Sequence, residues 1–157
     1  MMGLQFLKSG VALTMLPGLF IITIMEFIDY SDLYYREKLK EASPPKRAGK
    51  FVQLRTPGEE FIILSPKDFS AYHADIVRVF CEQRGIDGLY SFENKHFEIY
   101  GPEWAVIGGG KWSIDEQLKT LRLYGYSQGY GNFDPKGLKE RLLKINSLLD
   151  YEITINP

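Results

Sequence analysis

One histidine occupies a position that suits proton transfer. His73 follows Phe69 by one helical turn, in a segment whose apolar residues recur every three or four positions, as in an amphipathic helix. Desolvation on the apolar face and the positive end of the helix dipole both lower the pKa of a histidine. His73 would then be neutral at pH 7 and able to act as a general base. The competing interpretation is a core histidine whose nitrogens are satisfied by neighbouring groups.

Two glycine-rich segments are candidates for binding an anion. The first, residues 108–111 (GGGK), follows a predicted strand, and Lys111 adds a positive charge beside glycines that would let a ligand approach the backbone. This segment is not a P-loop, because Ala105 and Trp112 stand where that motif needs glycine and Ser or Thr. A bulge or a tight turn is the competing interpretation.

The second segment, residues 124–131 (YGYSQGYG), also follows a predicted strand. Successive backbone N–H groups in a turn can form a concave site for an anion. Ser127 adds a hydroxyl group, and Gly129 keeps the approach to the backbone open. The competing interpretation is a hairpin turn flanked by tyrosines.

Composition limits the classes of protein to consider. The chain has 157 residues, 45% of them hydrophobic, which is enough for one ordinary domain with its own core. A net charge of -1 gives no electrostatic case for binding nucleic acid. The single cysteine, Cys81, excludes an intramolecular disulfide and, with only two histidines, leaves no zinc cluster. We therefore expect no metal site and no cofactor.

Strand and helix patterns are interspersed after Lys50. The patterns predict strands over residues 51–56, 61–64, 89–92, 96–100, 104–107, 121–126 and 151–155, and helices over 69–84 and 135–149. Pro66 is expected in the first turn of the first helix and Gly85 at its C-cap. This pattern predicts an α+β fold: a single small domain with a mixed β-sheet flanked by two main helices, plus an extra N-terminal apolar and helical segment.

The first 48 residues differ from the rest of the chain. Residues 10–25 carry no charge, but Pro17 interrupts them and they fall short of the roughly 20 apolar residues that span a membrane comfortably. They are an uncleaved anchor or targeting segment, an extra element packed on the domain, or a stretch that is mobile in the mature protein. Good helix formers over residues 29–42 and a Pro-rich linker follow. We therefore divide the chain into this N-terminal part, residues 1–48, and a domain over residues 49–157.

Three motifs occur in the order seen in the Janus/Ocnus family. They are Tyr72-His73-Ala74-Asp75-Ile76, Gly108-Gly109-Gly110-Lys111 and the segment YGYSQGYG, and the ending DYEIT at residues 150–154 adds to them. The chain resembles this family from about Gly49 to Ile155. The resemblance implies a small α+β domain with a mixed sheet between two helices, in agreement with the pattern above. It also implies a phosphohistidine phosphatase-like activity, the metal-independent hydrolysis of phosphohistidine in proteins.

The resemblance assigns roles to particular residues. The histidine of the family motif is the general base, which places that role on His73. The lysine that opens the first strand of the family domain corresponds to Lys50 and would hold the phosphate, with Lys111 adding charge. The serine of the third motif and the two residues after it, Ser127, Gln128 and Gly129, would bind the phosphoryl oxygens.

The chemistry leaves two routes open. His73 either takes a proton from an attacking water molecule or attacks phosphorus itself and forms a transient phosphoenzyme. The expected partners are histidine-phosphorylated proteins, and we expect a cytoplasmic monomer. Association with a membrane or an organelle through residues 10–25 is the alternative location.

Three features depart from the family pattern. Lys111 and Ser65 stand where the pattern has arginine, and a lysine lacks the bidentate fork of a guanidinium group. The segment around residues 92–104 is also longer than usual and could alter access or partner choice. These departures motivate an alternative function, a non-catalytic phosphate- or phosphoprotein-binding module on the same fold.

Overall fold

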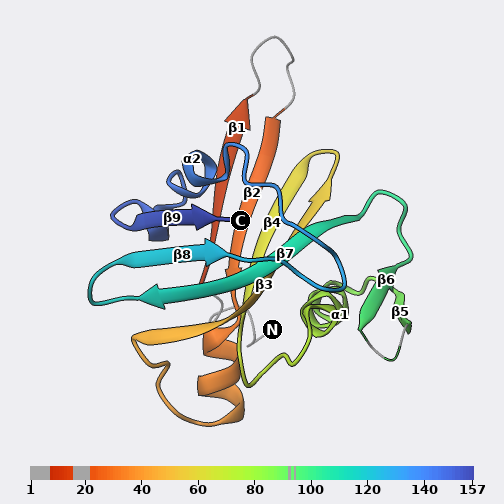
Figure 1. Ribbon diagram of the computed structural model, residues 1–157, viewed down its shortest axis with the longest axis horizontal. Helices are drawn as coiled ribbons and strands as arrows, with labels where there is room; N and C mark the ends of the chain where they lie inside the picture. Colours follow the sequence, from red (N-terminus) through yellow and green to blue (C-terminus); the bar gives the residue numbers. More distant parts are fainter. Residues whose placement is uncertain (1–7, 16–21, 92, 94) are drawn as a thin grey trace.

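The computed structural model describes residues 8–15, 22–91, 93 and 95–157, and its centre is a seven-stranded mixed sheet (Figure 1). In spatial order the strands are β1 (Lys8–Met15), β2 (Ile22–Asp29), β4 (Glu59–Pro66), β3 (Lys46–Thr56), β7 (Ala105–Asp115), β8 (Thr120–Tyr124) and β9 (Glu152–Asn156). The pairs β2–β4 and β8–β9 are parallel, and the others are antiparallel.

The remaining elements are short. They are the hairpin of β5 (Gly88–Ser91) and β6 (His96–Ile99), the helices α1 (His73–Arg84) and α2 (Leu138–Leu142), a π-helix (Leu33–Lys38) and a 3-10 helix (Asn146–Leu148). The β5–β6 hairpin forms a separate two-stranded sheet beside α1 (Figure 1). The predicted α+β class is confirmed, with a mixed sheet and a few helices in one small domain.

The sheet buries an apolar layer on each face. In β4, Phe61 and Ile63 pack with α1, whereas Ile62 and Leu64 pack with α2 on the other face. All four side chains are fully buried. Successive residues of a strand point to opposite faces, so a continuous apolar run marks a strand that is covered on both sides.

The helix that carries His73 begins four residues later than its apolar pattern predicts. Pro66 is not in its first turn but ends β4, where it pairs with Gly49 of β3. Tyr72 is the N-cap with an extended backbone, and the Asp75 carboxylate accepts its N–H at 2.9 Å. His73 is therefore the first residue of the helix. Gly85 is the C-cap with φ +66°, as predicted.

The second helix is also shorter than its pattern. Residues 135–149 were predicted as one helix, but α2 covers Leu138–Leu142 and a separate 3-10 helix follows. Gly137, with φ +66°, precedes α2 as its N-cap. The periodic pattern predicts a buried face of Leu138, Leu142, Ile145 and Leu149. The first three are buried, but Leu149 is 61% exposed and Leu148 is buried instead, because the 3-10 helix places residues three apart on the same side.

The N-terminal part extends the sheet. Strand β2 lies parallel to β4, and β1 pairs with β2 along the outer side. The buried Arg47 guanidinium joins this part to β3, donating to Asp29 Oδ2 at 2.8 Å and to Ser31 Oγ at 2.9 Å. The boundary predicted at residue 49 thus falls inside β3, and residues 16–21 of the apolar segment lie outside the described residues. Within the described part of the chain, no helix is long and apolar enough to cross a bilayer.

Candidate active site

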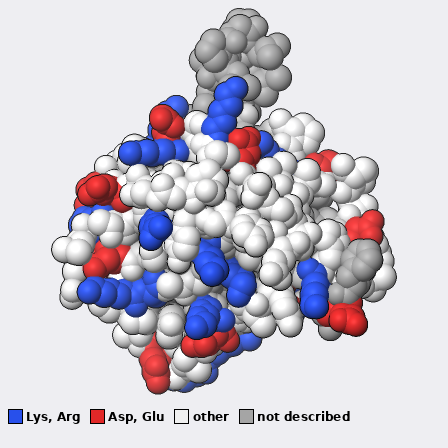
Figure 2. Space-filling view, in the orientation of Figure 1, with Lys and Arg blue, Asp and Glu red and all other residues white. Residues whose placement is uncertain are grey.

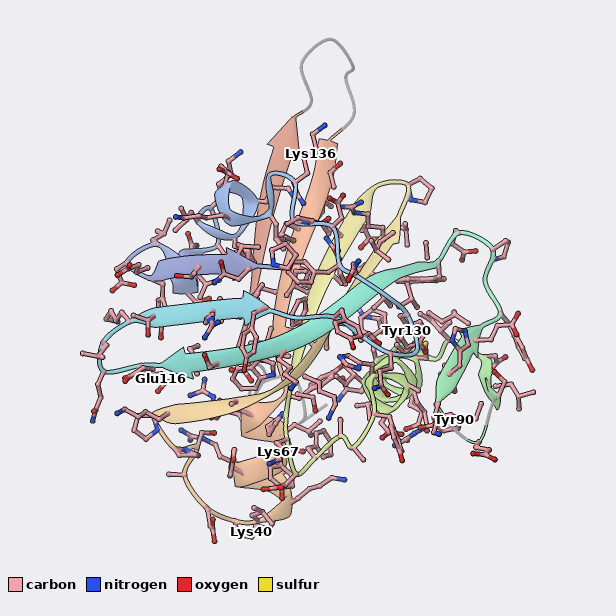
Figure 3. All side chains as sticks on the ribbon, viewed as in Figure 1. Lys40, Lys67, Tyr90, Glu116, Tyr130 and Lys136 are labelled. Atoms are coloured by element: carbon pink, nitrogen blue, oxygen red, sulfur yellow. The ribbon has the colours of Figure 1, made fainter. Side chains whose placement is uncertain are left out.

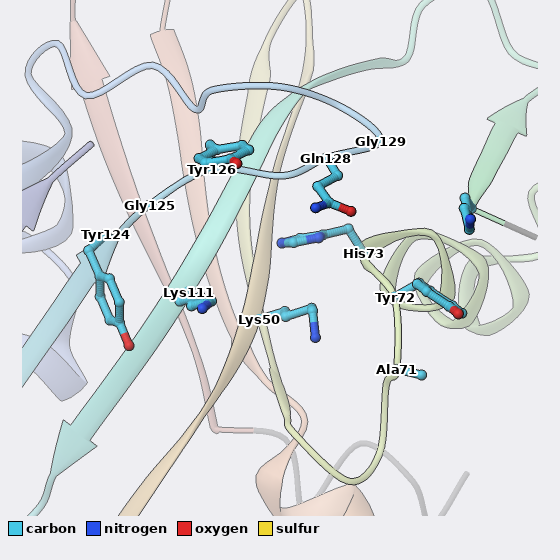
Figure 4. Close-up of a pocket in the computed structure, with 11 residues that line it drawn as sticks. Lys50, Ala71, Tyr72, His73, Lys111, Tyr124, Gly125, Tyr126, Gln128 and Gly129 are labelled. Atoms are coloured by element: carbon cyan, nitrogen blue, oxygen red, sulfur yellow. The ribbon is translucent and has the colours of Figure 1, made fainter.

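A pocket of about 580 Å³ opens where α1 begins, beside β3, β7 and the loop that follows β8 (Figure 4). Its lining residues are Lys50, Ala71, Tyr72, His73, Lys95, Lys111, Tyr124, Gly125, Tyr126, Gln128 and Gly129. The pocket therefore brings together five of the six site residues expected from the sequence, which come from four separate segments of the chain.

The imidazole of His73 is held by a backbone carbonyl. Its Nε2 lies 2.9 Å from the carbonyl oxygen of Gly110, and the residue is only 9% exposed. A carbonyl oxygen accepts hydrogen bonds and cannot donate, so Nε2 carries the proton. In the neutral ring the lone pair is then on Nδ1, which leaves this nitrogen able to accept a proton or attack an electrophile.

The surroundings of His73 favour the neutral ring. Burial lowers its pKa below the ordinary value, and the positive charges of Lys50 and Lys111 lower it further, whereas the hydrogen bond to Gly110 raises it. The net direction is down. His73 is consequently unprotonated at neutral pH, as a general base must be.

The glycine triplet makes room for the histidine. A Cβ atom on Gly109 would lie 2.9 Å from His73 Cδ2 and 2.5 Å from the carbonyl oxygen of Phe51. Gly108 is similarly crowded by the carbonyl oxygen of Asn132, at 2.1 Å from an added Cβ. The interpretation as a tight turn is wrong, because these residues lie inside β7, whereas the register of β7 against β3 does shift next to Gly108, as in a bulge. Glycine is required here because neighbouring backbone segments approach β7 closely, and not because the chain turns.

Lys50 and Lys111 are direct cross-strand partners on β3 and β7. Both line the pocket, and Figure 4 shows their side chains beside the His73 ring. Within the described part of the chain, neither ammonium group lies within ion-pair distance of a carboxylate. Like charges placed directly opposite in a sheet repel each other, so this pair forms a cationic site that favours an anionic ligand.

Basic side chains gather on one face of the molecule. Figure 2 shows a group of Lys and Arg side chains in the lower centre of this face. The pocket itself contains no acidic lining residue among those described. Across all the residues that the structure describes, no group of three His, Cys, Asp or Glu side chains is placed to hold a metal ion.

The loop after β8 contributes backbone amides. Ser127 and Gly131 exchange backbone hydrogen bonds at 3.0 and 2.8 Å, which closes a tight turn. Among the described residues, the N–H groups of Gln128 and Gly129 have no protein acceptor, and both residues line the pocket. Unpaired amides in such a turn are able to bind phosphoryl oxygens.

Ser127 is placed differently from the other expected binding residues. Its side chain is 1% exposed, and its Oγ accepts the Tyr130 N–H at 3.1 Å. The hydroxyl oxygen therefore stabilises the turn, and Ser127 is not among the lining residues. Ser65, at one of the positions where the family pattern has arginine, is also fully buried and contacts Ser70 Oγ at 2.7 Å.

Lys95 lines the pocket although the sequence did not single it out. It precedes β6 in the hairpin between α1 and β7. The sequence pattern predicts that hairpin, but no local signal shows that the hairpin lies against the loop after β8. Tyr72 and Tyr126 were also missed as lining residues, and they add aromatic surface at the mouth of the pocket, 47% and 60% exposed.

Comparison with known proteins supports the resemblance noted from the motifs. The family model described as Ocnus, the Janus/Ocnus family, matches residues 51–151. This range contains α1, the glycine triplet and the loop after β8, and it begins one residue after Lys50. No curated protein matches the chain. The family match covers well over half of the sequence, and the chain therefore belongs to the Janus/Ocnus family.

Proposed function

We propose that this protein is a metal-independent phosphatase that hydrolyses phosphohistidine in proteins, with His73 as the general base. The observation that carries the proposal is the arrangement around the His73 ring. A neutral imidazole with its Nε2 proton held by Gly110 lies beside two lysines, Lys50 and Lys111, that have no acidic partner among the described residues. Membership of the Janus/Ocnus family supports the same reaction class.

The reaction requires a nucleophile and screening of the phosphoryl charge. The oxygen of a water molecule attacks phosphorus in line with the phosphorus–nitrogen bond while His73 Nδ1 takes the water proton. The phosphorus–nitrogen bond breaks, its electron pair stays on the imidazole of the substrate, and that nitrogen takes up a proton. A correctly placed general base is worth about 10²–10⁴ in rate.

Fixed positive groups stabilise the charge that develops on the phosphoryl oxygens. Lys50 and Lys111 supply two ammonium groups from adjacent strands, and the amides of Gln128 and Gly129 supply N–H donors from the loop. These groups are in place before the substrate binds, so little reorganisation accompanies the reaction. Removal of one such donor typically costs about 10²–10³ in rate.

The test is release of phosphate from a histidine-phosphorylated protein by the purified full chain in the presence of EDTA. We expect turnover by the wild type and a loss of at least about 10²-fold in His73→Asn. His96→Asn, which changes the only other histidine of the chain, should retain turnover. Circular dichroism and urea unfolding check that each variant is folded. Equal turnover by wild type and His73→Asn contradicts the proposed role of His73.

The second candidate is a non-catalytic phosphoprotein-binding module. The buried Ser65 favours it, because this position supplies no charge to the pocket and leaves phosphate binding to lysines and amides. This candidate predicts binding of a phosphorylated peptide that is lost in Lys50→Met, with no release of phosphate by the wild type. Turnover that depends on His73 excludes it.

A further inference from the structure

Lys95 gives the pocket a third positive charge, and it comes from the β5–β6 hairpin. The other two lysines lie opposite each other on the central sheet, whereas Lys95 lies in the turn between β5 and β6 of the small second sheet. Figure 1 shows this hairpin at the edge of the molecule, next to α1. Its position allows it to meet parts of a ligand that extend away from the phosphoryl group.

The loop after β8 holds one side of the hairpin. The Tyr130 hydroxyl donates to the Phe97 carbonyl oxygen at 2.9 Å and accepts the Phe97 N–H at 2.8 Å. The rings of His96 and Tyr130 are 4.6 Å apart. A Cβ on Gly129 would lie 2.6 Å from the Lys95 carbonyl oxygen. The backbone of Lys95 therefore rests directly on the loop that offers amides to the phosphoryl group.

The start of α1 holds the other side. The Tyr90 hydroxyl donates to Asp75 Oδ1 at 2.6 Å and accepts a hydrogen bond from Arg78 Nε at 2.8 Å. The second carboxylate oxygen of Asp75 accepts the N–H of Tyr72, immediately before His73. Hydrogen bonds thus connect the hairpin both to the helix that carries His73 and to the phosphate-binding loop, which fixes the place of Lys95 relative to the pocket.

The charge on Lys95 is only weakly compensated. Its ammonium group lies 3.9 Å from Glu93 Oε2, and the two side chains are 60% and 90% exposed. Exposed pairs of this kind contribute little, so a ligand carboxylate is able to replace Glu93. In the proposed reaction the phosphoryl group engages Lys50 and Lys111, which leaves Lys95 for a second anionic group.

We propose that Lys95 is a specificity-determining residue that binds the carboxylate of an Asp or Glu close in sequence to the phosphohistidine of a target protein. This inference rests on the proposed function, because it takes the phosphoryl group to occupy the pocket beside His73. Lys95 contacts the target chain and not the reacting atoms. It therefore alters which phosphoproteins bind and leaves the chemistry of hydrolysis to the other residues.

The test compares two peptides that carry a hydrolysis-resistant phosphohistidine analogue, a phosphonate on a triazole ring. One peptide has aspartates next to the analogue, and the other has alanines. Calorimetry measures the affinity of each peptide for the full chain at low and high salt. Turnover of the corresponding phosphohistidine peptides is measured in parallel. The variants are Lys95→Ala, Lys95→Glu and the matched control Lys136→Ala, a lysine outside the pocket lining that Figure 3 labels near α2.

At low salt we expect the wild type and Lys136→Ala to bind the aspartate peptide about two- to fivefold more tightly than the alanine peptide, as for one exposed ion pair. High salt should reduce this preference. Lys95→Ala should remove the preference for the aspartate peptide without lowering the affinity for the alanine peptide. Lys95→Glu should reverse the preference. These four results together support the inference.

The inference is overturned if the wild type shows no preference, if the preference survives in Lys95→Ala, or if neither peptide binds. The parallel turnover measurement separates this failure from failure of the proposed hydrolysis. Turnover without any preference overturns only the role of Lys95. A preference that depends on Lys95, without turnover, overturns only the hydrolysis and leaves a selective phosphoprotein-binding site.

Discussion

Lys50 of β3 lies directly opposite Lys111 of β7, and neither side chain has an acidic partner among the described residues. Such a pair lowers the stability of the free protein, because like charges opposed in a sheet repel each other. It is explained if the site is built for an anion that binds between the two ammonium groups.

Lys50→Met tests this explanation through stability. Without ligand, we expect the free energy of unfolding to stay the same or rise by about 0.2–1 kcal/mol, since the variant removes the repulsion. Inorganic phosphate should stabilise the wild type in urea unfolding, because it binds only the folded state. The same phosphate should stabilise Lys50→Met much less. Lys136→Met is the control, and an equal loss of the phosphate effect in that variant would contradict the explanation.

Gly109→Ala should disturb both stability and the position of His73. An added Cβ would lie 2.5 Å from the Phe51 carbonyl oxygen and 2.9 Å from His73 Cδ2. Overpacking of this kind costs about 1–3 kcal/mol, and displacement of a catalytic group by about 1 Å can cost about 10² in rate. Urea unfolding and phosphate release measure the two effects. Gly58→Ala is the matched control, because an added Cβ there meets nothing within 4 Å.

The lowered pKa of His73 predicts a definite dependence of activity on pH. The ring stays mostly neutral until the pH falls below the ordinary histidine value of about 6.5. We expect the rate of phosphate release to be independent of pH near neutrality. The rate should decline only below about pH 6.5, where His73 Nδ1 becomes protonated. NMR titration of the ring protons identifies the group, with His96→Asn used to assign the signals. A His73 pKa above the ordinary value would contradict this prediction.

The same shift predicts a dependence of stability on pH. Between the lowered pKa of His73 in the folded state and about 6.5, the unfolded chain binds more protons than the folded chain. The free energy of unfolding therefore falls as the pH drops through this window, and the effect is absent above it. The decrease from pH 7.5 to 5.5 should be larger in the wild type than in His73→Asn. Urea unfolding measures this free energy, and equal decreases in the two proteins would show that His73 does not contribute to the pH dependence of stability.

Tyr130→Phe should loosen the hairpin that carries Lys95. The variant leaves the buried N–H and carbonyl oxygen of Phe97 without their hydroxyl partner, which costs about 1–3 kcal/mol per unsatisfied group. Hydrogen exchange at the Phe97 amide should accelerate, by a larger factor the more stability the hairpin loses. Tyr126→Phe is the matched control, since Tyr126 is 60% exposed and the described contacts include no hydrogen bond from its hydroxyl. Unchanged exchange in Tyr130→Phe would show that the hydroxyl does not hold the hairpin.

Several elements followed directly from the sequence. Local patterns in the sequence mark the apolar face of α1, the C-cap at Gly85 and the strand-forming runs of β3, β4 and β9. These signals are local, because side-chain periodicity and glycine's tolerance of positive φ depend on the segment itself. The motifs were likewise sufficient to identify the family.

The residues at which strands and helices begin and end could not be predicted from local patterns, because contacts with distant segments set them. Pro66 looked like the first residue of a helix, yet its pairing with Gly49 across the β3–β4 ladder keeps it in a strand. The helix then begins at His73 because the Asp75 carboxylate caps the Tyr72 N–H. A proline suits both places, and the choice between them depends on a strand that lies earlier in the chain.

The sequence by itself determined the fold class, the family and His73 as the residue to examine, because those rest on local periodicity and on motifs read in order. Only the tertiary structure decided that Lys50 faces Lys111, that Gly109 leaves space for the His73 ring and that Lys95 reaches the pocket. Each of these relationships joins segments far apart in the chain. Strand register and the docking of the hairpin set them, and no local pattern of residues records either one.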